Sequence, residues 1–234
     1  MIPGFRMLRR LGMLVAIAGV LFVGANVAVA RIAEGKIADA AQKEFGLDEK
    51  PVIHIKGMIL LGLLRGSLPG ITFEARNVKE QGLTIDVVTV DLRGVKASGI
   101  FGGKPSVTVL GGDVHATVSQ TSLNAYLRDN VGDVRTSIGE RGAANVTARK
   151  DGHVYVARGA LRLSGTMLRF DPATVTIDGK TPPPGFEQAA KQRAAFKVRI
   201  PALPGDIQVR TLETHRRSMS LTAAVDARTF SVGA

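Results

Sequence analysis

The chain has 234 residues, no cysteine and a formal net charge of +11, with 31 Lys and Arg against 20 Asp and Glu. The lack of cysteine excludes disulfide bonds, thiolate chemistry, cysteine-ligated zinc and a lipid-modified cysteine. Tryptophan is also absent, and the basic residues are scattered rather than interleaved with aromatic side chains. A nucleic-acid interface is therefore not expected. The positive charge either attracts an anionic lipid surface or only keeps the protein soluble.

An uncharged segment, Leu11 to Ala30, follows three arginines near the start of the chain. As a helix it would span about 30 Å, the hydrocarbon thickness of a bilayer. Arginines on one side hold that end in the cytoplasm. We therefore predict a single-pass anchor over residues 1–30 and one extracytoplasmic domain over residues 31–234. The alternative is export after signal cleavage near Ala30, because residues 28–30 fit a small-x-small cleavage site.

The segment from Arg31 to Gly46 is predicted to form an amphipathic helix. Apolar residues recur at every fourth position from Ala33 to Phe45, which is the spacing of one helix face. Gly46 can adopt the left-handed conformation that ends many helices. We expect this helix to continue directly from the membrane segment.

Beyond Pro51 the apolar pattern alternates with a period of two, which is typical of strands. In Leu83–Arg93 the apolar face shifts by one residue at Val88, and in Leu161–Phe170 it shifts at Leu168. Such a slip usually indicates a β-bulge, so we expect a strongly curved sheet. Further strands are predicted at Val52–Lys56, Ile71–Val78, Ser106–Leu110, Asp113–Ser119, Asn145–Arg149, His153–Arg158, Thr174–Asp178, Phe196–Ile200, Ile207–Thr211 and Met219–Asp226.

Two short segments have helical spacing instead, Thr121–Asp129 and Phe186–Ala195. The predicted fold class is therefore α+β, with about ten antiparallel strands, one long N-terminal helix and two short helices.

The segment Gly57–Leu68 is unusually apolar. It contains seven large apolar residues and a single charge, Arg65, but it is too short to span a bilayer. It either forms a buried turn that fills the core or lines an apolar cavity that accepts a lipid tail. Burial of a lipid chain gains about 0.8 kcal/mol per methylene, so such a cavity needs no catalytic group.

The order of these motifs resembles the LmeA-like phospholipid-binding family of actinobacterial cell envelopes. The similarity covers nearly all of the predicted exported domain. It is carried by RIAEGKIADAAQKEFG, PVIHIKGMILLGLLRG, VDLRGV, VHATVSQTSLNAYL and IPALPGDIQVRTL. Within the second motif, the positions that match are Gly57, Leu60, Leu63, Leu64 and Gly66. Met58 and Ile59 depart from the family, which more often has Pro-Phe there.

The resemblance implies a TULIP-like fold, in which a curled antiparallel sheet wraps around a long helix and encloses an apolar groove. It implies phospholipid binding without catalysis or a cofactor, with anionic phospholipid and a membrane surface as partners. The residues expected to line or gate the groove are Leu60, Leu63, Leu64, Phe73, Val90, Leu123 and Leu127. Arg65 either meets the lipid phosphate, because a guanidinium suits phosphate geometry, or is an ordinary surface arginine.

No pattern of residues points to an enzyme or to a metal site. The four histidines are far apart and match no zinc-binding spacing, and there is no GxSxG nucleophile elbow. The glycine-rich segment Ser98–Pro105 lacks the first glycine of a phosphate loop and has proline where Ser or Thr should bind magnesium. The alternative to lipid binding is a ligand-free structural or regulatory adaptor that binds another cell-envelope protein. A hollow interior would distinguish lipid binding from the adaptor.

Overall fold

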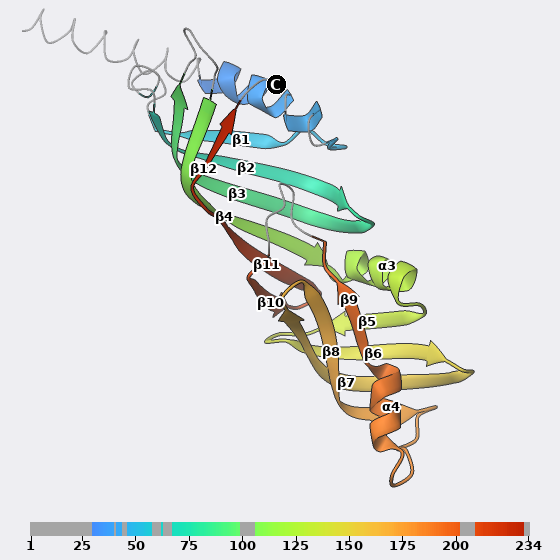
Figure 1. Ribbon diagram of the computed structural model, residues 1–234. Helices are drawn as coiled ribbons and strands as arrows, with labels where there is room; N and C mark the ends of the chain where they lie inside the picture. Colours follow the sequence, from blue (N-terminus) through green and yellow to red (C-terminus); the bar gives the residue numbers. More distant parts are fainter. Residues whose placement is uncertain are drawn as a thin grey trace, which may run out of the picture.

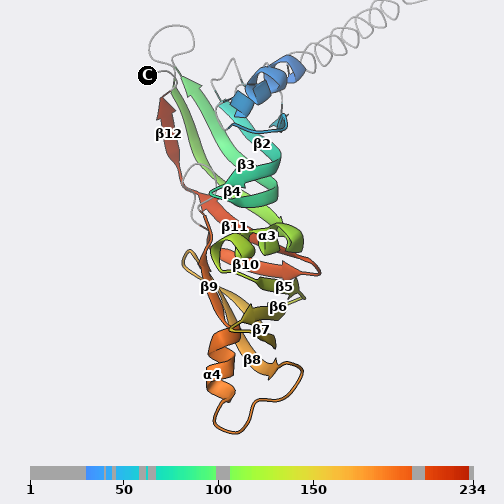
Figure 2. The ribbon, with the colours of Figure 1, turned by 90° about the vertical axis from the view of Figure 1, so that its right-hand side faces the viewer.

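The computed structural model describes residues 30–39, 41–43, 46–57, 62, 67–98, 106–201 and 209–231. In this part of the chain, the strands form two antiparallel sheets, one of seven strands and one of five. Figures 1 and 2 show that the sheets follow one another along the long axis of an elongated molecule. The first sheet curls strongly along its length, as the resemblance implied.

The first sheet has the strand order β1-β2-β3-β4-β11-β10, and β12 pairs with the other half of β4. Through β12, the chain returns to the end of the molecule where it enters the fold (Figure 1). The strands are β1 (Val52–Lys56), β2 (Ser67–Glu80), β3 (Leu83–Ser98), β4 (Ser106–Ser119), β10 (Thr211–His215), β11 (Ser218–Val225) and β12 (Arg228–Ser231).

The second sheet is a meander in which each strand pairs with the next along the chain. Helix α3 (Gln120–Asn130) connects the two sheets, and α4 (Glu187–Ala194) packs on the second. The strands of the second sheet are β5 (Val134–Ile138), β6 (Ala143–Lys150), β7 (His153–Ser164), β8 (Met167–Ile177) and β9 (Phe196–Arg199).

The predicted N-terminal amphipathic helix is present, with residues 30–39 and 41–43 helical. Gly46 has φ 58°, and the backbone N–H of Leu47 donates to the carbonyl of Gln42 at 3.0 Å. A left-handed glycine followed by this hydrogen bond is the Schellman ending of a helix. The glycine cap expected from the sequence is therefore confirmed.

The expected change of face in β3 occurs, but not through a bulge. The buried side chains change from Leu83 and Ile85 to Val88. The pairing with β2 keeps one register throughout, so no residue is inserted. Asn77 on β2 instead adopts a left-handed backbone with φ 53°, which turns the strand locally. The prediction of a bulge was therefore wrong, whereas that of a curved sheet was correct.

The predicted strand Leu161–Phe170 is instead a hairpin. Ser164 pairs with Met167 across a tight turn in which Gly165 has φ 59°. Leu163 then lies opposite Leu168. The two halves of the segment therefore point to the same face from neighbouring strands, which explains the apparent slip in phase. The register shift that does occur in this sheet lies between Arg158 and Gly159.

The expectation of about ten strands wrapped around one long helix is not met in the described part of the chain. There are two sheets, and the N-terminal helix rests on β1 and β2 through a small cluster of Ala38, Ile53 and Ile55. The predicted membrane segment, apart from residue 30, lies outside the described residues. Within the described ranges, no helix has the length and hydropathy needed to cross a bilayer.

A larger core joins the two sheets. It contains buried residues from both of them and from the apolar side of α3, including Leu123 and Leu127. The hydroxyl of Tyr126 on α3 donates to the carbonyl of Arg199 on β9 at 2.7 Å. This hydrogen bond links the connecting helix to the second sheet. Phe73 packs against both this core and the small cluster under the N-terminal helix, so it lies where the two meet.

Candidate functional site

An apolar row crosses five strands of the first sheet on one face. Ile53 on β1 lies opposite Phe73 on β2, which lies opposite Val90 on β3. Val90 lies opposite Val114 on β4, which in turn lies opposite Ala223 on β11. Directly opposed residues of a sheet project to the same side, so the five side chains form a continuous apolar row.

The two borders of this apolar face are covered, but its middle is only partly buried. The N-terminal helix covers Ile53, which is 6% exposed. Beside the core near α3, Ala75 and Val88 are 1% and 2% exposed. Between these borders lie four partly exposed side chains on β2 and β3. We call these four the apolar strip: Ile71, Phe73, Val90 and Leu92.

The opposite face of the same strands is polar, and several of its charges are paired. Asp91 accepts hydrogen bonds from the Thr72 hydroxyl at 2.6 Å and from Lys56 Nζ at 2.9 Å. These two donors hold the pKa of Asp91 below its usual 3.8. The guanidinium of Arg93 also forms an ion pair on this face, 3.1 Å from the carboxylate of Asp113. The first sheet is thus apolar on one face and polar on the other, which is typical of an antiparallel sheet with one solvated side.

An open depression of about 220 Å³ lies beside the N-terminal helix. Its polar wall contains Glu34, whose Oε1 accepts the backbone N–H of Ile55 at 2.9 Å. Its basic rim is formed by Arg31 and Lys50, of which Lys50 is paired with Asp39 at 2.6 Å. The depression shares Ile53 with the apolar row, so a depression with three charged side chains in its lining adjoins the apolar face at this border.

The structure brings together some of the predicted site residues. Phe73 and Val90 are direct partners on β2 and β3, and both are partly exposed in the apolar strip. Leu123 and Leu127 are 0% exposed and lie in the larger core on the inner side of α3. The remaining four predicted residues lie outside the described part of the chain: Leu60, Leu63, Leu64 and Arg65.

The sequence reasoning missed Ile71 and Leu92, which complete the apolar strip. Both lie within segments predicted as strands, and Leu92 is directly opposite Ile71. The available signal was their alternation with Phe73 and Val90 along the two strands. Alternation alone did not show which positions on the apolar face are left uncovered.

Within the described residues, no group of three or more His, Cys, Asp or Glu side chains could hold a metal ion. His153 Nδ1 lies 2.7 Å from Asp178, an exposed pair at the sheet end. Asp178 also accepts the backbone N–H of Val154 at 2.9 Å, and these contacts hold the pKa of its carboxyl below the usual value. The pair fastens the turn after β8 to the start of β7.

Comparison with known proteins gives one match. The family model described as LmeA-like phospholipid-binding matches residues 24–224, which is most of the chain. No curated protein and no solved structure matches the chain.

Proposed function

Because the chain belongs to the LmeA-like phospholipid-binding family, we propose that it holds a phospholipid with an acyl chain against the apolar strip. The observation that carries this proposal is the partial exposure of Ile71, Phe73, Val90 and Leu92 on a face whose borders are covered. An acyl chain laid on these residues would remove apolar surface on both sides from water. Each methylene buried in this way gains about 0.8 kcal/mol.

The apolar row is about as long as one acyl chain, although only its middle is open to a ligand. Its five strands are separated by four interstrand spacings of about 4.8 Å, which gives roughly 19 Å from Ile53 to Ala223. One acyl chain spans half of the bilayer hydrocarbon, or about 15 Å. The acyl chain would lie on the middle of this row, at Phe73 and Val90, because Ile53, Val114 and Ala223 are already buried by the protein.

The other predicted residues have defined roles in this proposal. Leu60, Leu63 and Leu64 gate the groove, and Leu123 and Leu127 close it toward α3. Arg65 meets the lipid phosphate, with Arg31 on the rim of the adjoining depression as a second guanidinium. This arrangement places the charged headgroup at the border near the N-terminal helix and the tail on the sheet.

We place the protein outside the cytoplasm, where it handles cell-envelope phospholipid without catalysing a reaction. A retained membrane segment favours local lipid handling at the membrane face. A cleaved signal favours shuttling of lipid between surfaces.

Photocrosslinking with a phospholipid that carries a photoreactive acyl chain tests the proposal on the full chain. The crosslinked peptides are then mapped by mass spectrometry. We expect crosslinks on Ser67–Ser98, which contains β2, β3 and the apolar strip. Crosslinks confined to residues 1–30, or spread evenly over both sheets, would contradict the groove. That result would favour the ligand-free adaptor.

A matched pair of valine variants sharpens this test. V90W fills the apolar strip and should reduce crosslinking about tenfold, the effect of losing 1.4 kcal/mol of affinity. V156W places the same side chain on the outer face of β7, where Val156 is 41% exposed, and should leave crosslinking unchanged. Equal effects of the two substitutions would show that the strip does not hold the lipid.

A further inference from the structure

The strands of the second sheet carry a large excess of positive charge. They contain eight Lys and Arg residues but one acidic residue, Asp171. All eight basic side chains are exposed, because they occupy the strand positions that alternate with the core or lie at strand ends. They are Arg135, Arg149, Lys150, Arg158, Arg162, Arg169, Lys197 and Arg199.

Three of these cations lie side by side across neighbouring strands. Arg162 on β7 is directly opposite Arg169 on β8, and Arg169 is directly opposite Lys197 on β9. We call these three residues the cationic row. Directly opposed side chains of a sheet have Cβ atoms about 5 Å apart, and like charges at that distance repel one another. The arrangement therefore works against the stability of the sheet.

The protein supplies little negative charge to offset this repulsion. Asp171 lies 3.9 Å from Arg162 and 3.7 Å from Arg169, so one carboxylate is shared at long range by two guanidinium groups. Lys197 makes no ion pair with any of the described residues. In the first sheet, by contrast, Lys56 and Arg93 each have a carboxylate within 3.1 Å.

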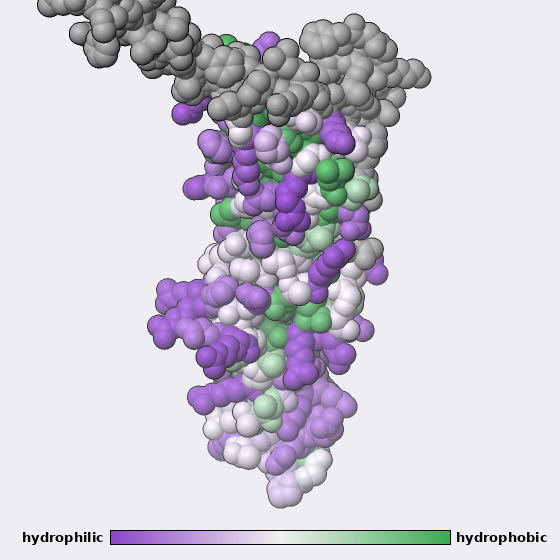
Figure 3. All heavy atoms as spheres, turned by 90° about the vertical axis from the view of Figure 1, so that its left-hand side faces the viewer, coloured by the Kyte–Doolittle hydropathy of each residue, from purple (hydrophilic) through white to green (hydrophobic). Residues whose placement is uncertain are grey.

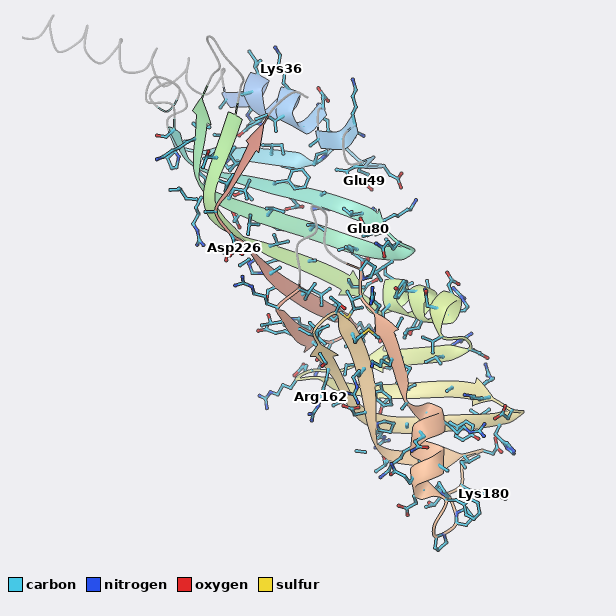
Figure 4. The ribbon with its side chains drawn as sticks, viewed as in Figure 1. Lys36, Glu49, Glu80, Arg162, Lys180 and Asp226 are labelled. Carbon is cyan, nitrogen blue, oxygen red and sulfur yellow. The ribbon has the colours of Figure 1, made fainter. Side chains whose placement is uncertain are left out.

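The cationic row lies in the half of the molecule away from the N-terminal helix. Figure 4 shows Arg162 beside the second sheet, pointing away from the ribbon, whereas Lys36 lies on the N-terminal helix beside the first sheet. Figure 3 views the molecule from the side on which Arg162 lies, and hydrophilic side chains protrude from much of that face. The row is thus open to a large partner.

We propose that the cationic row docks this sheet on the surface of an anionic phospholipid bilayer. Guanidinium and ammonium groups suit phosphate, and an exposed array of cations is attracted to an anionic membrane surface. The choice of a bilayer over another polyanion rests on the proposed function, because a protein that holds a phospholipid must meet a bilayer to load or release it.

The test uses the full chain reconstituted into phosphatidylcholine nanodiscs, so that the predicted membrane segment inserts into a neutral bilayer. The immobilised discs are then exposed to fluorescent vesicles of phosphatidylcholine alone or with phosphatidylglycerol. We expect capture of the phosphatidylglycerol vesicles only, with capture falling as salt screens the charges. Equal capture of neutral vesicles, or no capture of either kind, would overturn the proposal.

The variant R162Q/R169Q/K197Q removes the cationic row. Each basic residue near an anionic surface changes partitioning by about fivefold, so loss of three should reduce the captured vesicles by well over about tenfold. If this variant captures as many vesicles as the wild type does, the proposal is overturned. Binding of soluble polyphosphate by the wild type without capture of vesicles would also overturn it, and would assign the row to a polyanion instead.

A control variant with the same net charge as the row variant distinguishes the effect of the cationic row from the effect of overall charge. The variant K36Q/K43Q/R128Q removes three exposed cations that lie on the N-terminal helix and on α3. It should capture vesicles as the wild type does, and an equal loss in both variants would overturn the proposal. Acyl crosslinking on β2 and β3 is measured in the row variant as well. If the row variant loses vesicle capture but keeps its crosslinks on β2 and β3, the loss concerns docking alone, and the proposed lipid holding is unaffected.

Discussion

In the first sheet, the outward-facing Lys56, Arg76 and Arg93 each lie within 3.1 Å of a carboxylate, while the inner face keeps the partly exposed apolar strip. The second sheet has the reverse arrangement. Its inner face is filled, with Phe170 stacked on Phe196 at 5.8 Å. On its outer face, Arg149 is paired with Asp133 at 3.2 Å, but Arg162 and Arg169 share the single carboxylate of Asp171.

This difference separates what each sheet needs for stability from what it presents to a partner. A sheet that only had to fold would cover its apolar face and pair its charges. The first sheet departs from this rule on the inside and the second departs from it on the outside. Each departure marks the surface for which we propose a ligand, an acyl chain in one case and a bilayer surface in the other.

The largest expected effect is on the core of the second sheet. F170A removes a ring that is 1% exposed and should lower the free energy of unfolding by about 3–5 kcal/mol. F73A removes the same ring from the partly exposed strip and should lower it by clearly less, because less surface returns to water. Urea denaturation of both variants measures the difference. Equal losses would show that Phe73 is an ordinary core residue.

A smaller effect of opposite sign is expected at the cationic row. R169T removes the central cation and places a β-branched residue in the strand. It should raise the free energy of unfolding by roughly 0.2–1 kcal/mol, the range of a cross-strand pair. R93T is the control from the first sheet, where loss of the Asp113 pair should give no gain. If R169T destabilises the protein, the row is not a site of unrelieved repulsion.

An effect of similar size, opposite in sign to that of R169T, concerns the paired outer face of the first sheet. Because Thr72 and Lys56 lower the pKa of Asp91, its stabilising effect is fully present above pH 3.8 and disappears as the pH falls through the lowered value. D91N should therefore cost at most about 1 kcal/mol at neutral pH, as expected for an exposed ion pair. The difference from the wild type should vanish in acid. Urea denaturation of D91N and the wild type, at neutral pH and at a pH below the lowered pKa of Asp91, checks this. A difference in unfolding free energy that persists in acid would contradict it.

Local patterns in the sequence were sufficient to predict most of the elements. The segment Val52–Lys56 was predicted with the bounds that β1 has, and Thr121–Asp129 lies within α3. The N-terminal helix and its glycine end were also predicted correctly. In each case the signal lies within a few residues, either an alternation, a helical spacing or a glycine after the last turn.

Other elements could not be predicted because local pattern was misleading. β5 was missed because Thr136 interrupts its apolar positions, although this side chain is 2% exposed in the core. The hairpin at Gly165 was read as one strand because both halves are apolar. Asn124 on helix α3 bonds both the N–H and the carbonyl of Thr136, and no feature of the strand itself records this.

The sequence by itself determined the periodic elements, the excess of basic residues, the absence of cysteine and the resemblance to a phospholipid-binding family. Only the tertiary structure decided that the strands divide into two sheets and that the apolar strip stays partly exposed. It also decided that Arg162, Arg169 and Lys197 lie directly opposite one another on neighbouring strands. The reason is physical. Periodicity fixes which side of a strand is apolar, whereas strand pairing and coverage depend on which distant segments come to lie beside it.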